Sequence, residues 1–542
     1  GLVGSEMCIR DRFLYPLSFF VKNILSVYWD IDKMSNFSDN KRIAKNTIFL
    51  YIRLIFVMGV SLYTVRAILS LLGATDYGLY NVIGGFVSMF SFISGTLSSS
   101  SQRYFSISLA ENDFRKLNDW FCLNLNLFVI IIVFLIFIAE TFGLWFINNK
   151  MTIPIERLTA ANIIFQLSLL GFCCSLVNTP YLALIIAYEK MKTFAYIGML
   201  EALFKLAIVG ILYFVSTDKL IVYGILIFVI NVSITLSYVG YVSRKIPQIH
   251  YYVYWNKIEI AELASFSGWH LLGTISVVLR GQGINVLLNV FFNPIVNTAR
   301  AIAFQIESAV MQLQNNFFLA LKPQIYKLYA VHDYSQLHTL IVRSTQICFF
   351  LTSILSIPLF FELDTVLDLW LVEVPEYTRA FTTLVLLNGL IDSVSGPMIA
   401  PILATGKIRN FYLITGNLII FTLPISYVVL HYGCSPESVF IVTISFSFLA
   451  MMCRIYFLHK LIKIPFLEYI IELIKLFIAT VVICIVVTLY IYMTPDSAMR
   501  FFIVIILSSV LHLIMYYYFV ISSNDRKALN GYVSKFHGKI WK

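Results

Sequence analysis

Fourteen long apolar segments follow one another along this 542-residue chain, separated by short polar connections. A transmembrane helix needs ~20 apolar residues, and each segment is long enough to cross a bilayer. Hydrophobic residues make up 59% of the chain and charged residues only 13%, whereas about a quarter of a soluble domain is charged. The segments span 46–72, 78–100, 121–147, 160–187, 193–215, 220–242, 264–292, 296–320, 340–361, 380–405, 410–430, 438–458, 466–492 and 501–521. The pattern predicts an all-α polytopic membrane protein with 14 transmembrane helices.

Lys and Arg are distributed unequally between alternate connections. One set, which includes residues 41–45 and the tail from Arg526, carries 22 of them. The other set carries only Lys150, Arg157, Lys219, Arg379 and Arg500. Because cytoplasmic loops are enriched in Lys and Arg, we expect both termini to be cytoplasmic. Anionic lipid head groups then serve as counterions for the net charge of +10, and no nucleic-acid partner is expected.

Two short motifs recur about 220 residues apart. The first motif reads Pro180, Ala187, Lys190, Lys192 and Phe194, and its copy reads Pro397, Ala404, Lys407, Arg409 and Phe411. The second reads Ala110, Asp113, Phe114 and Leu117, and its copy reads Ala330, Asp333, Tyr334 and Leu337. Such recurrence indicates duplication of a six-helix unit. Because six is even, both copies enter the membrane in the same orientation, as parallel repeats.

The repeat predicts the domain organisation. We expect two six-helix lobes at 34–245 and 246–463, two extra helices within 464–522, and a basic cytoplasmic tail at 523–542. Residues 1–33 are expected to be an artefactual or disordered extension, with Met34 as the start. Two lobes related in this way enclose a cleft at their interface, where transported substrates usually bind.

Residues that could carry catalysis are scattered. The eight cysteines show no paired metal-ligand spacing and no set that could form disulfides in outer loops. The sequence also contains no phosphate-binding glycine loop and no nucleophile arrangement. We therefore predict no catalytic residue, no metal site and no cofactor.

Four arginines lie within or at the ends of apolar segments: Arg53, Arg66, Arg280 and Arg300. A charge near the bilayer centre costs ~3 kcal/mol, which carboxylate partners, cavity water or an anionic ligand must offset. Carboxylates are scarce in these segments, and Glu307 and Asp392 are the main candidates. The excess of cations predicts a cavity for phosphate or pyrophosphate, because guanidinium groups match the oxygens of these anions.

Polar side chains accompany these charges. Gln282 and Asn285 follow Arg280 closely, and a polar stripe marks one helical face with Gln305, Gln312 and Asn316. We expect Gln282 and Asn285 to line the substrate cavity with the arginines and to bind the pyrophosphate. The stripe should face water or a partner helix, and its residues and Glu307 are candidates for a polar cavity or for coupling. Asp392 is a candidate for binding a coupling ion, but a hydrogen-bonded structural role explains it equally well.

Structural explanations stay open for several of these residues. Arg66 is near enough to the end of its segment to reach the interface, and Arg53 could anchor at the inner interface. Glycines on either side of Gln282 could instead mark close packing of helices around Arg280. Glu201 and Lys205 lie one helical turn apart, which favours an internal ion pair over a proton site.

Two stretches resemble a known superfamily. The stretch from Asn46 to Ala110 is similar to the opening helices of polysaccharide exporters in the multidrug/oligosaccharidyl-lipid/polysaccharide (MOP) superfamily, and it contains LYIRLIFVMGVSLYTVRAILSLLGATDYGLYNVIGGFVSMFSFISGTLSSSSQRYFS. Residues 268–306, GWHLLGTISVVLRGQGINVLLNVFFNPIVNTARAIAFQI, resemble the matching helices of Wzx-type O-antigen and capsule flippases, particularly those of Bacteroides-like bacteria. The similarity covers about residues 40 to 460.

This resemblance implies a fold of two six-helix lobes plus two helices. It also implies a flippase that moves undecaprenyl-pyrophosphate-linked oligosaccharide across the bacterial cytoplasmic (inner) membrane by alternating access. Cationic cavity residues would engage the pyrophosphate, and Arg53, Arg66, Arg280 and Arg300 are the counterparts we nominate. The expected partners are the lipid-linked oligosaccharide and the bilayer, with polysaccharide polymerase and chain-length proteins as further candidates.

Three alternatives compete with a polysaccharide flippase. A multidrug or cation antiporter of the same superfamily should have a carboxylate-rich cavity, which the arginine surplus disfavours. A lipid II flippase would share the helices and the cationic cavity. A membrane-embedded glycosyltransferase or O-antigen polymerase should need a sizeable outer loop, whereas the longest predicted outer connection, 362–379, has fewer than twenty residues.

Overall fold

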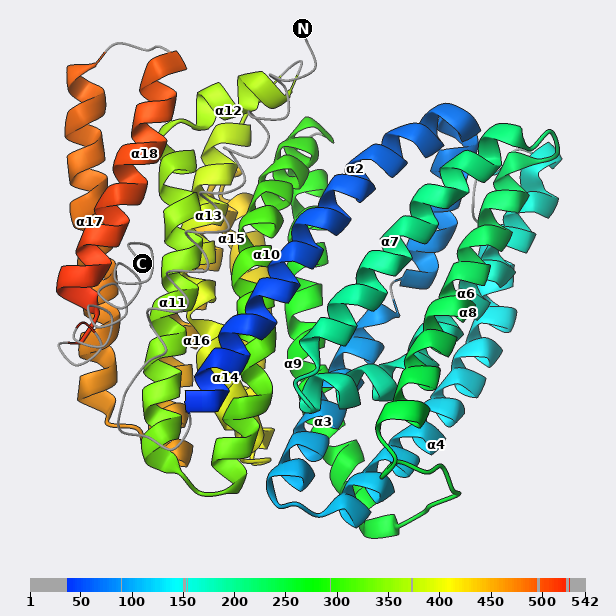
Figure 1. Ribbon diagram of the computed structural model, residues 1–542. Helices are drawn as coiled ribbons and strands as arrows, with labels where there is room; N and C mark the ends of the chain where they lie inside the picture. Colours follow the sequence, from blue (N-terminus) through cyan, green and yellow to red (C-terminus); the bar gives the residue numbers. More distant parts are fainter. Residues whose placement is uncertain are drawn as a thin grey trace, which may run out of the picture. The chain divides into compact units, whose positions relative to one another are not determined.

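Helices form nearly all of the computed structural model shown in Figure 1. It describes residues 37–88, 90–149, 153, 155–292, 294–371, 374–494, 498–522 and 526, and these ranges contain no strand. The all-α prediction is therefore confirmed for the described chain. The expected extension at 1–33 and the tail at 523–542, apart from Arg526, lie outside the described residues.

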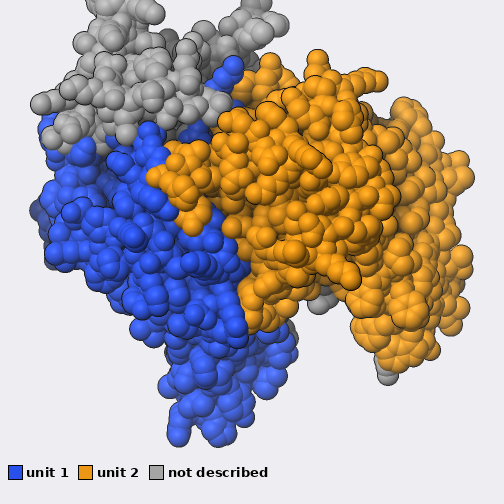
Figure 2. Space-filling model, turned by 90° about the horizontal axis from the view of Figure 1, so that it is seen from below, with its two compact units in different colours: residues 1–48, 276–325, 333–542 blue, residues 49–275, 326–332 orange. Residues whose placement is uncertain are grey.

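The chain forms two compact units, coloured separately in Figure 2. Unit 2 comprises residues 49–275 and 326–332, and unit 1 comprises the described residues of 1–48, 276–325 and 333–542. Both α9 and α10 therefore contribute to each unit. The predicted lobe boundaries at 245 and 463 stay a prediction.

The helices of the first half of the chain are long. They are α2 (Phe37–Ser88), α3 (Ser91–Ala110), α4 (Phe114–Ile138), π-helical η1 (Ala139–Gly143), α5 (Leu144–Asn149), the 3-10 turn η2 (Ile155–Arg157), α6 (Leu158–Ala187), α7 (Met191–Phe214) and α8 (Lys219–Lys245). α2 is broken at Gly73, where φ is 78° and ψ is 166°, a conformation that glycine adopts readily. This break ends the first predicted span.

The second half follows with a similar series. It contains α9 (Lys257–Phe291), α10 (Pro294–Ala330), α11 (Tyr334–Phe361), α12 (Leu363–Trp370), α13 (Thr378–Ser393), α14 (Ser395–Ala404), α15 (Arg409–His431), α16 (Ser438–Ile462), α17 (Phe466–Met493), α18 (Ala498–Met515) and π-helical η3 (Tyr516–Val520). The α13–α14 junction lies within one predicted span, residues 380–405.

Twelve helical stretches of the described chain are long and apolar enough to span a membrane. They coincide with twelve of the fourteen predicted segments. The predicted segment 78–100 is helical but divided between α2 and α3, and the predicted segment 296–320 lies within α10. The polar residues of α3 and α10 lower the hydropathy of these two segments.

Each unit packs its helices in the same pairs. In unit 2, α6 packs on α8 and α7 also packs on α8. In unit 1, α13 and α14 pack on α16, and α15 packs on α16. The predicted spans four, five and six (α6, α7 and α8) therefore pack in the same pairs as the predicted spans ten, eleven and twelve (α13–α14, α15 and α16). This agrees with parallel repeats.

Backbone geometry marks the two motif pairs as structural equivalents. Asn112 and His332, 220 residues apart, have φ values of 56° and 58°. Asp113 and Asp333 follow them, and each accepts a hydrogen bond from the backbone N–H three residues later, as helix N-caps do. Glu189 and Gly406, 217 residues apart, also have positive φ values of 57° and 72°.

A buried ion pair fastens α18 to the end of α11. Arg500 donates from Nε and Nη2 to the two carboxylate oxygens of Glu362, at 2.9 and 3.2 Å. The Glu362 side chain is only 1% exposed. Two parallel hydrogen bonds give this pair geometric specificity as well as strength.

Replacing Arg500 with Met should destabilise the protein by about 3–5 kcal/mol, because it leaves the buried Glu362 carboxylate without a cation. Thermal unfolding in detergent would measure the effect. The exposed pair of Arg379 and Asp364 provides a matched control, since Arg379→Met should cost less than about 1 kcal/mol. Equal losses in the two single variants would contradict the role of the buried pair. The double variant Glu362→Gln with Arg500→Met should be more stable than Arg500→Met alone, because it removes the unpaired carboxylate.

Candidate functional site

Five charged side chains form a connected group in unit 1, which we call the charge cluster. It comprises Arg280, Arg300, Glu307, Asp392 and Arg454, contributed by α9, α10, α13 and α16. Glu307 interacts electrostatically with Asp392, Arg280 and Arg300, and Arg454 interacts with Asp392 and Arg280. Three guanidinium groups and two carboxylates leave one positive charge in excess when both acids are ionised.

Arg300 is held at the α9 surface. Its Nη2 donates to the Gly281 carbonyl oxygen at 2.7 Å, and its Nη1 donates to Asn285 Oδ1 at 3.2 Å. The guanidinium also stacks over Phe304, 4.5 Å from the ring centroid. The Arg300 Nε is buried and has no hydrogen-bond partner among the described residues. One donor of this guanidinium is thus enclosed by protein without an acceptor among the described residues.

Arg280 lies on the same helix as the groups that hold Arg300. It is half-buried, and its Nη1 donates to Ser447 Oγ on α16 at 3.2 Å. Gly283 contributes the helix packing expected around Arg280, because a Cβ there would lie 2.6 Å from Leu423 Cδ2. A Cβ on Gly281 would meet nothing within 4 Å, so Gly281 serves the cluster through its carbonyl oxygen.

The two acids of the charge cluster have different surroundings. Asp392 accepts from Asn388 Nδ2 at 2.8 Å and lies 4.0 Å from Arg454 Nη1. Glu307 Oε1 lies against α13, 3.6 Å from the position that a Cβ on Gly389 would occupy, which is an ordinary van der Waals distance. These contacts support the structural explanation of Asp392 and leave the coupling ion unassigned.

Arg454 is a charge-cluster member that the sequence interpretation missed. It is 7% exposed, and its Nη1 donates to Ser395 Oγ at 2.6 Å, directly after the α13–α14 junction. Its position in an apolar segment of α16 was the available signal. Arg103 of α3 lies three residues after the predicted segment 78–100, and the structure buries it against Tyr104 and Phe266 in unit 2.

The other predicted site residues of the second half are exposed or half-buried. Gln282, Gln305 and Gln312 are exposed on unit 1, and Asn285 and Asn316 are half-buried. Asn316 Nδ2 donates to the Gln312 carbonyl oxygen of its own helix at 2.8 Å. Among the predicted polar residues that the structure describes, Asn285 accepts a hydrogen bond from a cluster guanidinium, that of Arg300.

Arg53 and Arg66 belong to unit 2. Arg66 is exposed, whereas Arg53 is half-buried with its guanidinium 4.2 Å from the centroid of the Phe194 ring. Glycine at 198 permits this approach, because a Cβ there would lie 2.3 Å from Arg53 Nε. Arg53 also interacts electrostatically with Glu201. Unit 2 therefore holds its own partly buried arginine on α2.

The predicted ion pair of α7 is confirmed. Lys205 Nζ lies 2.6 Å from Glu201 Oε1, one turn along the helix. Glu201 is thus shared between Lys205 and Arg53, and this group also has one positive charge in excess. In the part of the chain that the structure describes, no three His, Cys, Asp or Glu side chains gather as a metal site.

The fold is similar to that of solved transporters. An outward-facing multidrug resistance MATE family transporter of the MOP superfamily matches with a TM-score of 0.67 at 13% identity, over 77% of this chain and 96% of its own. A MATE structure in the straight conformation matches with a TM-score of 0.64 at 14% identity, over 78% and 96%. At these identities the similarity establishes the fold alone, a MATE-like arrangement of membrane helices.

A third solved structure is described by the polarity of its binding pocket. A MOP superfamily transporter from Pyrococcus furiosus, described as having a binding pocket of reverse polarity that suggests a different function, matches with a TM-score of 0.64 at 12% identity, over 77% and 96%. No protein-family model matches the chain. No curated protein matches it either.

Arg454 is more deeply buried than Arg280, so we expect the two arginines to contribute differently to stability. Arg454→Met should cost about 3 kcal/mol, because it removes a buried guanidinium and leaves the half-buried Asp392 without its ion-pair partner. Arg280→Met should cost about 1 kcal/mol, since it removes one hydrogen bond from a half-buried side chain. Membrane abundance and thermal unfolding of both variants would measure this. A greater loss for Arg280→Met would reverse the assignment.

Proposed function

We propose that this protein is a membrane transporter that moves undecaprenyl-pyrophosphate-linked oligosaccharide, an O-antigen or capsule repeat unit, across the bacterial cytoplasmic membrane by alternating access. The single observation that carries the substrate class is the sign of the charge cluster. Three arginines and two acids leave a positive surplus within membrane helices. The MATE-like fold supports transport, and the flippase resemblance of residues 46–110 and 268–306 supports the lipid-linked sugar.

The chemistry of the substrate matches that surplus. Pyrophosphate carries negative charge and several acceptor oxygens, and guanidinium groups bind such oxygens through parallel N–H donors. In a site of low dielectric constant, this attraction offsets the desolvation of both partners only where several N–H donors match the phosphate oxygens closely. Arg280 and Arg300 would bind the pyrophosphate, while Arg454 and Asp392 hold the cluster in place.

A cation exporter is the closest alternative, because the solved structures with this fold include multidrug MATE transporters. A cationic drug needs a site with excess negative charge. Glu307 and Asp392 are outnumbered in the charge cluster, and Glu201 is already shared between two cations. The polarity of both groups therefore favours an anionic substrate.

Arg280→Ala should lower the rate of lipid-linked oligosaccharide translocation about 10- to 100-fold, the loss expected for one charged hydrogen bond of 1.5–3 kcal/mol. The assay uses proteoliposomes with a fluorescent lipid-linked sugar and measures its arrival in the opposite leaflet. Arg280→Lys should recover part of the rate, and Arg244→Ala, at an exposed arginine near the end of α8, should leave it unchanged. Wild-type translocation by Arg280→Ala would remove Arg280 from the substrate site.

A second arm of the same assay separates the two transporter functions. Proteoliposomes are given a lipophilic cationic dye in place of the lipid-linked sugar. The flippase proposal expects no saturable movement of the dye. Movement of the dye without movement of the sugar would replace the flippase by a cation exporter.

Gly198→Ala should reduce translocation as much as Arg53→Ala does. The added methyl group would lie 2.3 Å from Arg53 Nε and force the guanidinium away from Phe194. Gly210→Ala is a matched control on the same helix, because its Cβ would meet nothing within 4 Å. Full activity of Gly198→Ala alongside an inactive Arg53→Ala would show that the position of Arg53 does not matter.

A further inference from the structure

An apolar cavity of about 560 Å³ lies in unit 1, bordered by α11, α13, α16 and α17. On α17 its lining positions are 477, 480–481, 484–485 and 488–489. These positions recur every three or four residues, so they share one face of the helix. On α13 the lining positions 386–387 and 390–391 also share a face. The cavity therefore runs lengthwise along α17.

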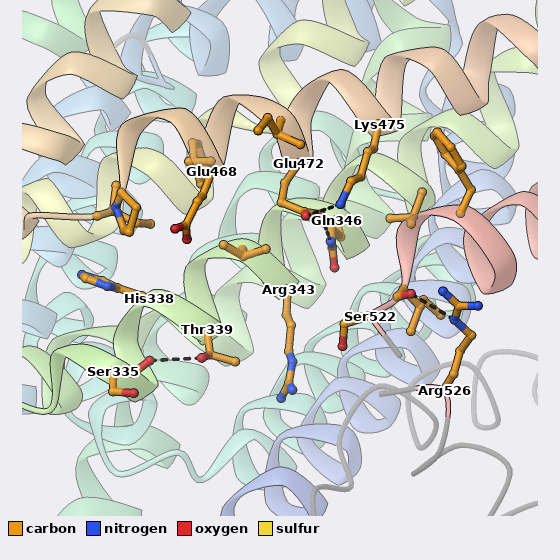
Figure 3. A pocket seen from close by; sticks show the side chains of 18 residues that line it. Ser335, His338, Thr339, Arg343, Gln346, Glu468, Glu472, Lys475, Ser522 and Arg526 are labelled. Atoms are coloured by element: carbon orange, nitrogen blue, oxygen red, sulfur yellow. Dashed lines mark hydrogen bonds and ion pairs between the residues drawn. The ribbon is translucent and has the colours of Figure 1, made fainter. Parts of the chain in front are cut away.

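Polar contacts hold α17 beside α11. Gln346 Nε2 of α11 donates to Glu472 Oε2 of α17 at 3.0 Å, and the hydroxyls of Thr345 and Tyr469 share a hydrogen bond of 2.8 Å. Figure 3, which is drawn around another pocket along the same two helices, shows the contact of Gln346 with Glu472. These contacts join the first halves of both helices, whereas most of the cavity borders their second halves. They oppose a movement of α17 that would close the cavity.

The lining offers water few hydrogen-bond partners. None of the described residues that line the cavity is charged. Thr480 and Thr488 donate their hydroxyl protons to carbonyl oxygens of their own helix, at 3.0 and 2.7 Å. A buried water needs about two to four polar partners, and an empty cavity costs its lining residues their dispersion contacts. The lining therefore favours an apolar occupant.

The cavity lies at the depth of lipid acyl chains. Its α17 lining runs from the twelfth to the twenty-fourth residue of a membrane span of 28 residues, a distance of about 18 Å along the helix. The hydrocarbon core of a bilayer is ~30 Å thick, so the acyl chains of one leaflet extend through about 15 Å. Val481, Ile485 and Leu489 are 56%, 54% and 54% exposed, so the cavity continues the surface that α17 presents to the bilayer. A chain from an adjoining lipid can therefore enter it.

We propose that this cavity binds one acyl chain of a membrane phospholipid. The chain lies along the lining face of α17 and contacts Phe477 of that helix, Leu390 of α13 and Ile444 of α16. Because the lining carries no cationic side chain that would hold a pyrophosphate, a polyprenyl carrier has no advantage here over the abundant phospholipids. The bound chain fills the space between α17 and α13 and so stabilises α17 in its position. The proposal is independent of the transported substrate.

Photolabelling of the full chain in nanodiscs tests the proposal. The nanodiscs contain phosphatidylcholine with a trace of phosphatidylcholine that carries a diazirine near the end of one acyl chain, and mass spectrometry identifies the labelled residues. We expect label on Leu386 and Leu390, two lining residues of α13 that are only 2% and 8% exposed. Cys484→Trp places a large side chain in the cavity from α17. It should reduce this labelling roughly tenfold, the effect of removing about two methylene groups from apolar contact.

Val486→Trp is the matched control, because Val486 is 37% exposed on the same helix and is not among the residues that line the cavity. It should leave the labelling of α13 unchanged. Should Cys484→Trp fail to fold, Ile485→Trp fills the cavity from its exposed edge and should have the same effect. Wild-type protein without label on Leu386 and Leu390, or equal labelling in the wild type and the filling variants, would overturn the proposal. Loss of the label on addition of about one polyprenyl phosphate per protein would replace the phospholipid by a polyprenyl chain.

Discussion

The cost of placing a charge in hydrocarbon governs the interior of this protein. An arginine within a membrane helix is tolerated only where partners, water or a ligand offset that cost. The charge cluster of unit 1 meets the requirement in part, through serine hydroxyls, a glycine carbonyl oxygen and two carboxylates. The remaining positive charge is the physical reason for proposing an anionic substrate.

Several features follow directly from the sequence. Backbone groups in lipid must be hydrogen-bonded internally, so apolar segments of this length could form only helices. The repeat was visible in two motifs whose equivalents share left-handed backbone at Asn112 and His332, and at Glu189 and Gly406. The ion pair of Glu201 and Lys205 was predictable because both residues lie on one helix, where spacing alone determines contact.

Contacts between helices distant in the sequence were harder to predict. Arg454 and Asp392 are 62 positions apart, and nothing in either segment identifies the other as a partner. Helical periodicity groups Gln305 and Gln312 on one face but does not reveal what that face meets, and both side chains are exposed on unit 1. Arg53 depends on a glycine in another helix, whose importance becomes visible only through the 2.3 Å approach.

Photocrosslinking tests the central claim most directly. A lipid-linked oligosaccharide with a photoreactive group beside its pyrophosphate is activated in membranes that contain the wild-type protein, and the labelled peptides are identified by mass spectrometry. The account predicts labelling of α9 and α10 around Arg280 and Arg300, with inorganic pyrophosphate reducing it. Labelling confined to other helices, or unaffected by pyrophosphate, would contradict a cationic substrate site.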